Sequence, residues 1–216
     1  MENDMSINAQ NTVRESGSRR GAVREFKKGL IRDAAKRIFA ERGIDAASMR
    51  EIAQAAGYTT GAIYTYFDTK EELYAEVLRD SLHALQSEVA TTVETSPDRP
   101  ASAAALHGLW SFYDTHPADF ELGFYLYGGV RPAGLNKKLD EELNTLFDQV
   151  MTLIANGLIT DGLATEQTAH HLAVVHATWV FGLLLMTKTG RVKSVRDDAE
   201  AMLDSYLKMV ATHQML

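Results

Sequence analysis

The chain has 216 residues, of which 45% are hydrophobic and 24% are charged, so it can bury one large core or two smaller ones. It contains no cysteine, which excludes disulfide bonds, thiolate metal sites and cysteine nucleophiles. The absence of cysteine and of a basic-then-apolar leader favours a cytoplasmic location. The longest apolar run, residues 172–186, is shorter than the roughly 20 residues that cross a bilayer. We therefore expect a buried helix there and no membrane association.

Charge is distributed unevenly around the net value of −7. Nine basic and three acidic residues lie between Arg14 and Arg37, whereas nine basic and seventeen acidic residues follow from Asp80 to the end. A basic N-terminal part on an acidic body is typical of a protein that meets a polyanion. A solvated arm without any partner would show the same charges, so charge alone leaves both interpretations open.

The first 22 residues are polar and show no apolar period, and we expect residues 1–22 to form a disordered arm. Helical spacing begins near residue 24, and Gly43 is the expected end of the first helix. The apolar face of this helix follows the three-and-four spacing of an amphipathic helix. Its members are Ile31, Ala34, Ala35, Ile38 and Phe39.

Two short helices are predicted next. Ser48 and Glu51 have the spacing of a capping box, which begins a helix that we expect to end at Gly57. Thr59 can cap a second short helix that extends to about Tyr66. A further capping box at residues 69–72 begins a long helix that reaches about residue 90.

A proline-containing break at residues 96–100 separates these helices from the rest of the chain. No run alternates polar with β-branched residues as a strand would, so the sequence predicts an all-α fold of about nine helices. We expect one domain over 23–78, built from the short helices, and a larger helical domain over 79–216. Helices beyond the break are predicted at 101–115, 117–129, 136–160, 166–188 and 195–214.

The two short helices, joined by a tight glycine turn and preceded by a basic helix, have the pattern of a helix-turn-helix. In that motif the second helix enters the major groove with its N-terminal end first. Ile63 and Phe67 are expected to hold this helix to the core. Threonine and tyrosine hydroxyls can bond bases or phosphates, and Gly61 permits a close approach to the duplex. Positioning charge would come from the basic residues nearby.

The segment IRDAAKRIFAERGIDAASMREIAQAAGYTTGAIYTYFDTKEELYAEVL, residues 31–78, resembles the N-terminal DNA-binding domain of the TetR family of transcriptional regulators. The densest agreement is GAIYTYF at 61–67, followed by KEEL at 70–73. Family members often carry Ser-Lys or Ser-Arg where Thr59-Thr60 stand here, and a basic residue or histidine at Thr65. Base readout by this helix would therefore depend on uncharged groups.

The resemblance implies DNA contacts from the second short helix, a phosphate contact near Tyr66 and Lys70, and a cap beside a phosphate contact at Ser48. Together with the basic residues of the first helix, the expected DNA-binding residues are Ser48, Thr59, Thr60, Gly61, Ala62, Tyr64, Thr65, Tyr66, Lys70, Arg24, Lys27 and Lys28. Each threonine and serine could equally serve only as a helix cap.

The resemblance also implies that the C-terminal domain forms a homodimer through its last two helices and binds a small-molecule effector. Repression of a palindromic operator, released by an apolar or aromatic ligand, is the mode expected for the family. Dimer-interface candidates, which could instead be intramolecular core, are Ala173, Val180, Leu184, Met202, Tyr206 and Val210. Effector-pocket candidates are His107, Trp110, Tyr113, His116, Phe124, Tyr125, Phe147, His176 and Trp179.

No metal site, cofactor or catalytic centre is expected. His170 and His171 are adjacent, about 100° apart on a helix, and His176 lies five residues beyond His171, so the three cannot easily share one ion. The sequence has no glycine-rich phosphate loop, nucleophile elbow or HExxH motif. A helical module that binds other proteins through its short helices remains an alternative, and a helical enzyme is a more distant one.

Overall fold

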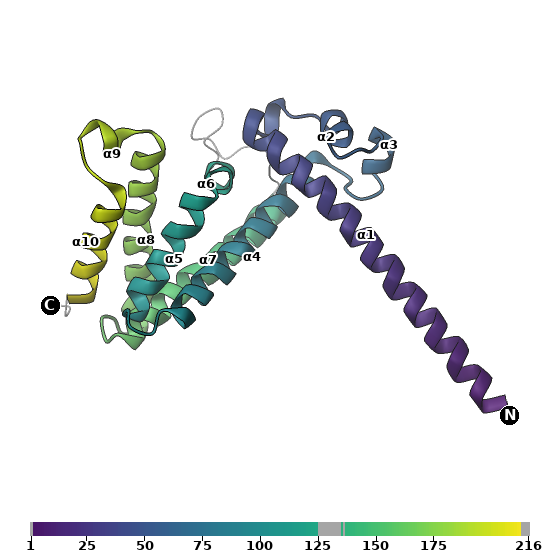
Figure 1. Ribbon diagram of the computed structural model, residues 1–216, viewed down its shortest axis with the longest axis horizontal. Coiled ribbons are helices and arrows are strands. Elements are labelled where there is room, and N and C mark those ends of the chain that lie inside the picture. Colours follow the sequence, from purple (N-terminus) through teal and green to yellow (C-terminus); the bar gives the residue numbers. More distant parts are fainter. Residues whose placement is uncertain (1, 125–134, 136, 213–216) are drawn as a thin grey trace. The chain divides into compact units, whose positions relative to one another are not determined.

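The computed structural model describes the backbone of residues 2–124, 135 and 137–212, with side chains in these ranges from Arg19 onward. Helices are the regular elements within the described ranges, where ten of them occur (Figure 1). The prediction of an all-α fold is confirmed. The chain divides into two compact units, Met1–Val77 and Leu78–Leu216, and the division falls one residue before the expected boundary.

The first unit contains three helices and the beginning of a fourth. Their bounds are α1 Glu2–Ala46, α2 Met49–Ala55, α3 Thr60–Ile63 and α4 Lys70–Thr95, the last of which continues into the second unit. The sequence predicted two short helices between two longer ones, and this order is present. The expected helix to about Tyr66 is shorter in the structure, because the residues after Ile63 form turns in which Tyr66 N donates to Ile63 O at 2.9 Å.

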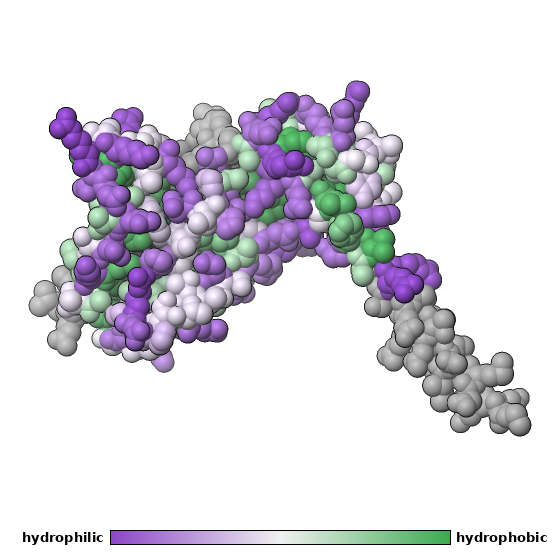
Figure 2. All heavy atoms as spheres, viewed as in Figure 1, coloured by the Kyte–Doolittle hydropathy of each residue, from purple (hydrophilic) through white to green (hydrophobic). Residues whose placement is uncertain are grey.

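Helix α1 begins at Glu2, which differs from the expected disordered arm over 1–22. Once a helix is nucleated by a packed segment, each further residue gains one backbone hydrogen bond, so extension does not require an apolar face. The helical geometry is interrupted at Gly43, whose φ of 74° and ψ of 166° are not helical. Exposed apolar side chains lie along the solvated part of α1, where Figure 2 also shows apolar surface: Val23, Phe26 and Leu30.

The core of the first unit is built from the predicted faces. Ile31, Ala34, Ala35 and Phe39 of α1 are buried, and Ile38 is half-buried. Helices α2, α3 and α4 cover this face with Ile52, Ile63, Leu73 and Tyr74, all of them buried. The rings of Phe39 and Tyr74 meet edge to face at 5.1 Å, a favoured arrangement of an aromatic pair.

The second unit is a bundle around α5. Two of its helices have the predicted bounds, whereas α6 ends before residue 129 and residues 125–134 lie outside the described ranges. A short helix after Gly190 was not expected from the sequence, and the last helix begins at Ala199 instead of near residue 195. The bounds are α5 Ala101–Thr115, α6 Pro117–Gly123, α7 Lys137–Thr160, α8 Glu166–Lys188, α9 Arg191–Ser194 and α10 Ala199–Thr212.

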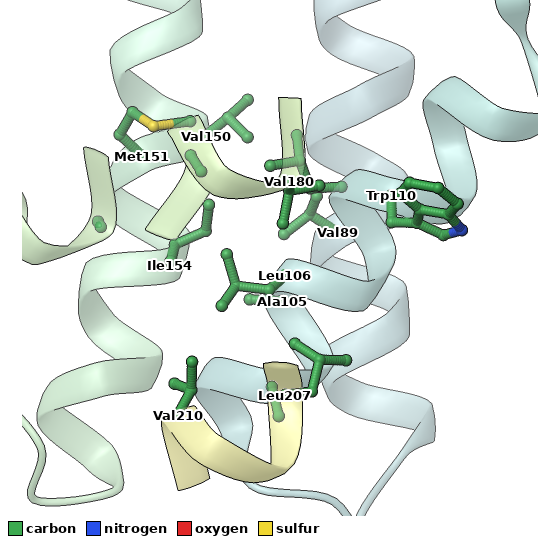
Figure 3. Packing of buried hydrophobic residues seen from close by; sticks show 14 of the residues in the cluster. Val89, Ala105, Leu106, Trp110, Val150, Met151, Ile154, Val180, Leu207 and Val210 are labelled. Atoms are coloured by element: carbon green, nitrogen blue, oxygen red, sulfur yellow. The ribbon is translucent and has the colours of Figure 1, made fainter. Parts of the chain in front are cut away.

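The core of this bundle joins α4, α5, α7, α8 and α10. Figure 3 shows side chains of these helices converging, with Leu106 of α5 near Ile154 of α7 and Val180 of α8 above them. Trp110 belongs to this cluster and is 4% exposed. Burying a large aliphatic side chain contributes roughly 1.5–3 kcal/mol, so this cluster is the main source of the unit's stability.

Helices α5 and α7 approach most closely where α5 begins. A Cβ atom at Gly157 of α7 would lie 2.8 Å from the backbone nitrogen of Ser102, so only glycine fits there without displacing backbone. One helical turn further, the Asp161 carboxylate accepts hydrogen bonds from the backbone nitrogens of Ala101 and Ser102 at 3.0 and 2.8 Å. These bonds satisfy N–H groups at the start of α5 that have no partner within the helix.

Four of the six dimer-interface candidates are buried in the core of their own unit, the alternative that the sequence left open. Ala173, Val180 and Leu184 are fully buried within the unit's own core, as is Val210 of α10 at 5% exposed, so their side chains face inward. The reason is the helical spacing itself, because residues 173, 177, 180 and 184 share one face and that face packs on α5 and α7. The two other candidates, Met202 and Tyr206, are half-buried.

The opposite face of α8 is also apolar. Glu166–Lys188 is long and apolar enough to cross a membrane by length and composition, and a third (33%) of its most apolar window is buried within the chain. Large apolar side chains on the solvent side of α8 are Val174, Val175, Leu185 and Met186. Met209 adds a further exposed apolar side chain on α10.

Candidate nucleic-acid interface

The N-terminal end of α2 is fixed by a complete capping box. The Ser48 hydroxyl accepts from the Glu51 backbone nitrogen at 3.2 Å, and the Glu51 carboxylate accepts from the Ser48 backbone nitrogen at 3.2 Å. The hydrogen bond from Ser48, and then the charge of Arg42 at 2.6 Å, lower the pKa of the Glu51 carboxyl. Ser48 is exposed, and its structural role is the cap that the spacing predicted.

The turn into α3 requires a left-handed residue, which Gly57 supplies with φ of 77°. Thr59 then caps α3 by accepting from the Ala62 backbone nitrogen at 3.2 Å. Ile63 and Phe67 are 0% and 1% exposed, so they anchor this segment to the core as expected. The result is a short segment that packs on the core along one side and is exposed to solvent along the other.

The open side of α3 carries no charged residue between Thr59 and Phe67. Thr59, Gly61 and Tyr64 are exposed, with 48% of Tyr64 accessible. A Cβ atom at Gly61 would have no atom within 4 Å, so the fold does not require glycine there. Thr60 and Ala62 are half-buried, and the exposed Thr65 turns its hydroxyl back to donate to Ala62 O at 2.7 Å.

Helix α1 brings basic side chains to the end of α3. Arg24 Nη2 donates to Thr65 O at 3.2 Å, and the Arg24 guanidinium lies 5.4 Å from the centre of the Tyr66 ring. The Lys28 ammonium lies 5.2 Å from the centre of the Phe67 ring. Both distances lie within the range of cation–π interactions, which hold the two positive charges beside residues 59–67. Lys27, which lies between Arg24 and Lys28 in the sequence, is half-buried.

Lys70 has a structural role in addition to the expected phosphate contact. Its ammonium donates to Ala47 O at 3.0 Å and to Asp45 O at 3.3 Å, so it ties the start of α4 to the loop between α1 and α2. An ammonium has three donors, and these two bonds leave capacity for one more acceptor. Removing Lys70 would therefore change the loop as well as any contact with DNA.

The second unit contains two cavities that include predicted effector residues. The first, of about 200 Å³, is bounded by α4, α5, α6 and α7. Three of the predicted effector residues, Tyr113, Phe124 and Phe147, line it, whereas none of its polar members except Tyr113 was predicted. Its described lining is Leu78, Ser81, Leu82, Tyr113, Asp119, Gly123, Phe124, Asp140, Leu143, Asn144 and Phe147.

The second cavity, of about 300 Å³, lies among α7, α8 and α10 and is almost wholly apolar. His176 lines it and bonds through Nδ1 to the Tyr206 hydroxyl at 2.7 Å, while Tyr206 stacks on Trp179 with ring centres 3.7 Å apart. Burial lowers the pKa of His176, so its ring is uncharged at neutral pH, and burial raises the pKa of Tyr206 to about 12.

The remaining effector candidates lie elsewhere. Trp110 is part of the core, and His116 is exposed and stacks on Phe112 at 4.8 Å between ring centres. His107 is half-buried, and burial, followed by the charge of Arg99, lowers its pKa. Tyr125 lies outside the described residues. Among the described residues no group of three His, Cys, Asp or Glu side chains could hold a metal ion.

Helices α1, α2 and α3 are joined by short connections, and Ser48 and Thr59 cap the second and third of them. This arrangement, followed by a larger helical unit, defines a helix-turn-helix protein. Residues 31–77 match the model of the bacterial regulatory proteins of the tetR family. A solved transcriptional regulator from Rhodococcus sp. Rha1 shares the fold with a TM-score of 0.65 and 23% identity, over 88% of this chain and 98% of that one. Residues 31–77 thus form a DNA-binding domain of the tetR type, and the described chain shares the fold of solved regulators.

Two curated relatives support this assignment. The transcriptional repressor KstR2 of Rhodococcus jostii (strain RHA1) is 31% identical over 132 residues, which cover 60% of this chain and 64% of that protein. The transcriptional activator FasR of Mycolicibacterium smegmatis (strain ATCC 700084 / mc(2)155) is 34% identical over 111 residues, 50% of this chain and 51% of that protein. The chain thus matches less than two thirds of the length of these relatives. Both are regulators rather than enzymes.

Proposed function

We propose that the protein is a repressor that binds a palindromic operator as a homodimer and releases it when a small molecule occupies the second unit. The observation that carries the DNA-binding part is the open, uncharged face of α3 with the Arg24 guanidinium held at its end. Neutral hydroxyls and Gly61 would supply fit to the bases, while the flanking cations would supply affinity for phosphates. Repression, rather than activation, follows the family's commonest mode.

The phosphate role of Arg24 gives the first prediction. Arg24→Gln should weaken binding about threefold to tenfold on every duplex and reduce the slope of affinity against salt by about one, because one phosphate contact is lost. The measurement is fluorescence anisotropy over a salt series, with a duplex that the wild-type protein has selected from random-sequence DNA. Arg191→Gln, an exposed arginine of α9, is the matched control and should bind as the wild type does. An unchanged salt slope in Arg24→Gln would contradict the phosphate role.

Dimerisation would place two α3 helices on half-sites about one helical turn (~34 Å) or more apart. The proposed interface is the partly exposed apolar side of α8 together with Met209 of α10, where each large apolar side chain is 41–53% exposed. A second copy with the same helices could pair with it in a four-helix bundle. Large apolar side chains that gather on one exposed surface are costly in water and are typical of an interaction surface.

The prediction for this surface concerns the double variant Val175→Glu and Leu185→Glu. Two carboxylates on each protomer would be desolvated and brought near their symmetry mates, so we expect a folded monomer at micromolar concentration. Sedimentation velocity measures the change, with Gln149→Glu on the exposed side of α7 as a control that should remain dimeric. A wild-type protein that sediments as a monomer, or a double variant that stays dimeric, would contradict this interface.

The cavity bounded by α4–α7 is the proposed effector site. Its wall includes Leu78, Ser81 and Leu82 of α4, and α4 is the same helix whose first residue, Lys70, ties down the loop before α2. A ligand that shifts the position of α4 would therefore act on an element of the DNA-binding unit. The aromatic wall and few polar groups are usual for a small-molecule site.

A further inference from the structure

The described lining of the cavity bounded by α4–α7 is acidic. Its two carboxyl groups belong to Asp119 and Asp140, and no Lys, Arg or His is among the described lining residues. Asp119 is 2% exposed, whereas Asp140 is exposed. Tyr113 lines the same cavity, and burial, followed by the charge of Asp119, raises the pKa of its hydroxyl far above its usual range.

The rest of the wall offers aromatic rings. Phe124 lies 6.3 Å from Tyr113 and 4.8 Å from Phe181, and Phe147 lies 5.9 Å from Phe181, all between ring centres. Ring faces attract cations and stack with aromatic ligands. A carboxylate attracts a cation more strongly in a site of low dielectric constant than in bulk water.

The two cavities would therefore favour different ligands. Among the described residues that line the second cavity, the polar side chains are the uncharged His176 and Tyr206, so this lining gives no preference for a charged ligand. The first has aromatic walls and carboxylates, and an anionic ligand would meet repulsion there. Its volume of about 200 Å³ somewhat exceeds the engineered cavity of about 150 Å³ that holds benzene.

We propose that the effector is a small aromatic amine, protonated at neutral pH, whose ammonium group pairs with Asp119 while its one or two rings pack against Phe124 and Phe147. This inference names the ligand class of the proposed effector site and so rests on that proposal. Asp140, on the same side of the cavity wall as Phe147, would add attraction for the same charge.

The test uses three probes with one aromatic body: naphthylmethylamine, naphthylmethanol and naphthoate. Isothermal titration calorimetry at neutral pH, with the full chain and no DNA, should show the amine binding at least about tenfold more tightly than the alcohol, with naphthoate weakest. Asp119→Asn should remove most of the amine's advantage and leave the alcohol's affinity within about twofold. Asp148→Asn, an exposed carboxylate of α7 outside the lining, is the matched control and should bind all three probes as the wild type does.

Naphthoate binding as tightly as the amine, an amine that does not bind at millimolar concentration, or an unchanged amine preference in Asp119→Asn would each overturn the proposal. If circular dichroism shows that Asp119→Asn does not fold, Asp140→Asn carries the test. It should weaken the amine about threefold without affecting the alcohol, and equal effects on both would refute the charge pairing. Because calorimetry needs no DNA, failure here leaves the DNA-binding proposal standing, and loss of DNA binding leaves this result interpretable.

Discussion

Gly61→Leu is expected to reduce affinity for the selected duplex by about 100-fold (~2.7 kcal/mol) while the protein remains folded. A side chain at Gly61 meets no atom within 4 Å in the protein, so nothing in the fold opposes it. Leucine is also a better helix former than glycine by roughly 0.5–1 kcal/mol, so thermal stability should be equal or higher. DNA affinity would be lost because the leucine side chain would hold α3 away from the bases. Fluorescence anisotropy and a thermal melt measure the two effects.

The control for Gly61→Leu is Ser87→Leu, which places the same side chain on an exposed position of α4. This variant should bind DNA as the wild type does, and it reports any unspecific effect of an exposed leucine. A folded Gly61→Leu protein with wild-type affinity would show that α3 does not lie against the duplex.

Gly157→Ala is expected to lower the free energy of unfolding by about 2 kcal/mol, the cost of overpacking a tight contact. The new Cβ would lie 2.8 Å from Ser102 N and 2.9 Å from Ala101 C, and both are backbone atoms that move only if α5 moves. The shift would also strain the hydrogen bonds that Asp161 accepts from the start of α5. Urea unfolding at one fixed protein concentration measures the change, since dimerisation would make it concentration-dependent.

Gly61→Ala is the matched control for Gly157→Ala. The substitution is the same and the helix is again the setting, but the space around Gly61 is open, so stability should rise by up to about 1 kcal/mol. Equal stability changes at the two positions would contradict the close approach of α5 and α7. A loss of stability in Gly157→Ala together with a gain in Gly61→Ala would show that steric overlap, and not helix propensity, causes the loss.

Local signals in the sequence predicted most of the helices. Ser48 with Glu51 and Thr59 begin their helices as the capping patterns indicate. Gly43 interrupts α1 three residues before it ends at Ala46, and Gly57 follows the end of α2, both with positive φ. Such signals act within a few residues, so a single sequence contains them. The short helix after Gly190 was missed because four residues carry too little periodicity to be recognised.

The contacts of α8 could not be read from the sequence. This helix is apolar on both faces, so spacing alone does not tell which face meets the chain's own core, and the candidate Val180 lies on the face that does. Asp119 was overlooked for a related reason, because an acidic residue after Pro117 resembles an ordinary first-turn residue of a helix. Only tertiary packing shows that it is buried in a cavity wall.

Selection of duplexes from random-sequence DNA at low salt shows whether α3 of a dimer binds a palindromic operator. We expect enrichment of an inverted repeat whose half-sites lie about one helical turn (~34 Å) or more apart, with affinity that falls steeply as salt rises. Retention of no duplex at low salt, or enrichment of a sequence without two-fold symmetry, would contradict it.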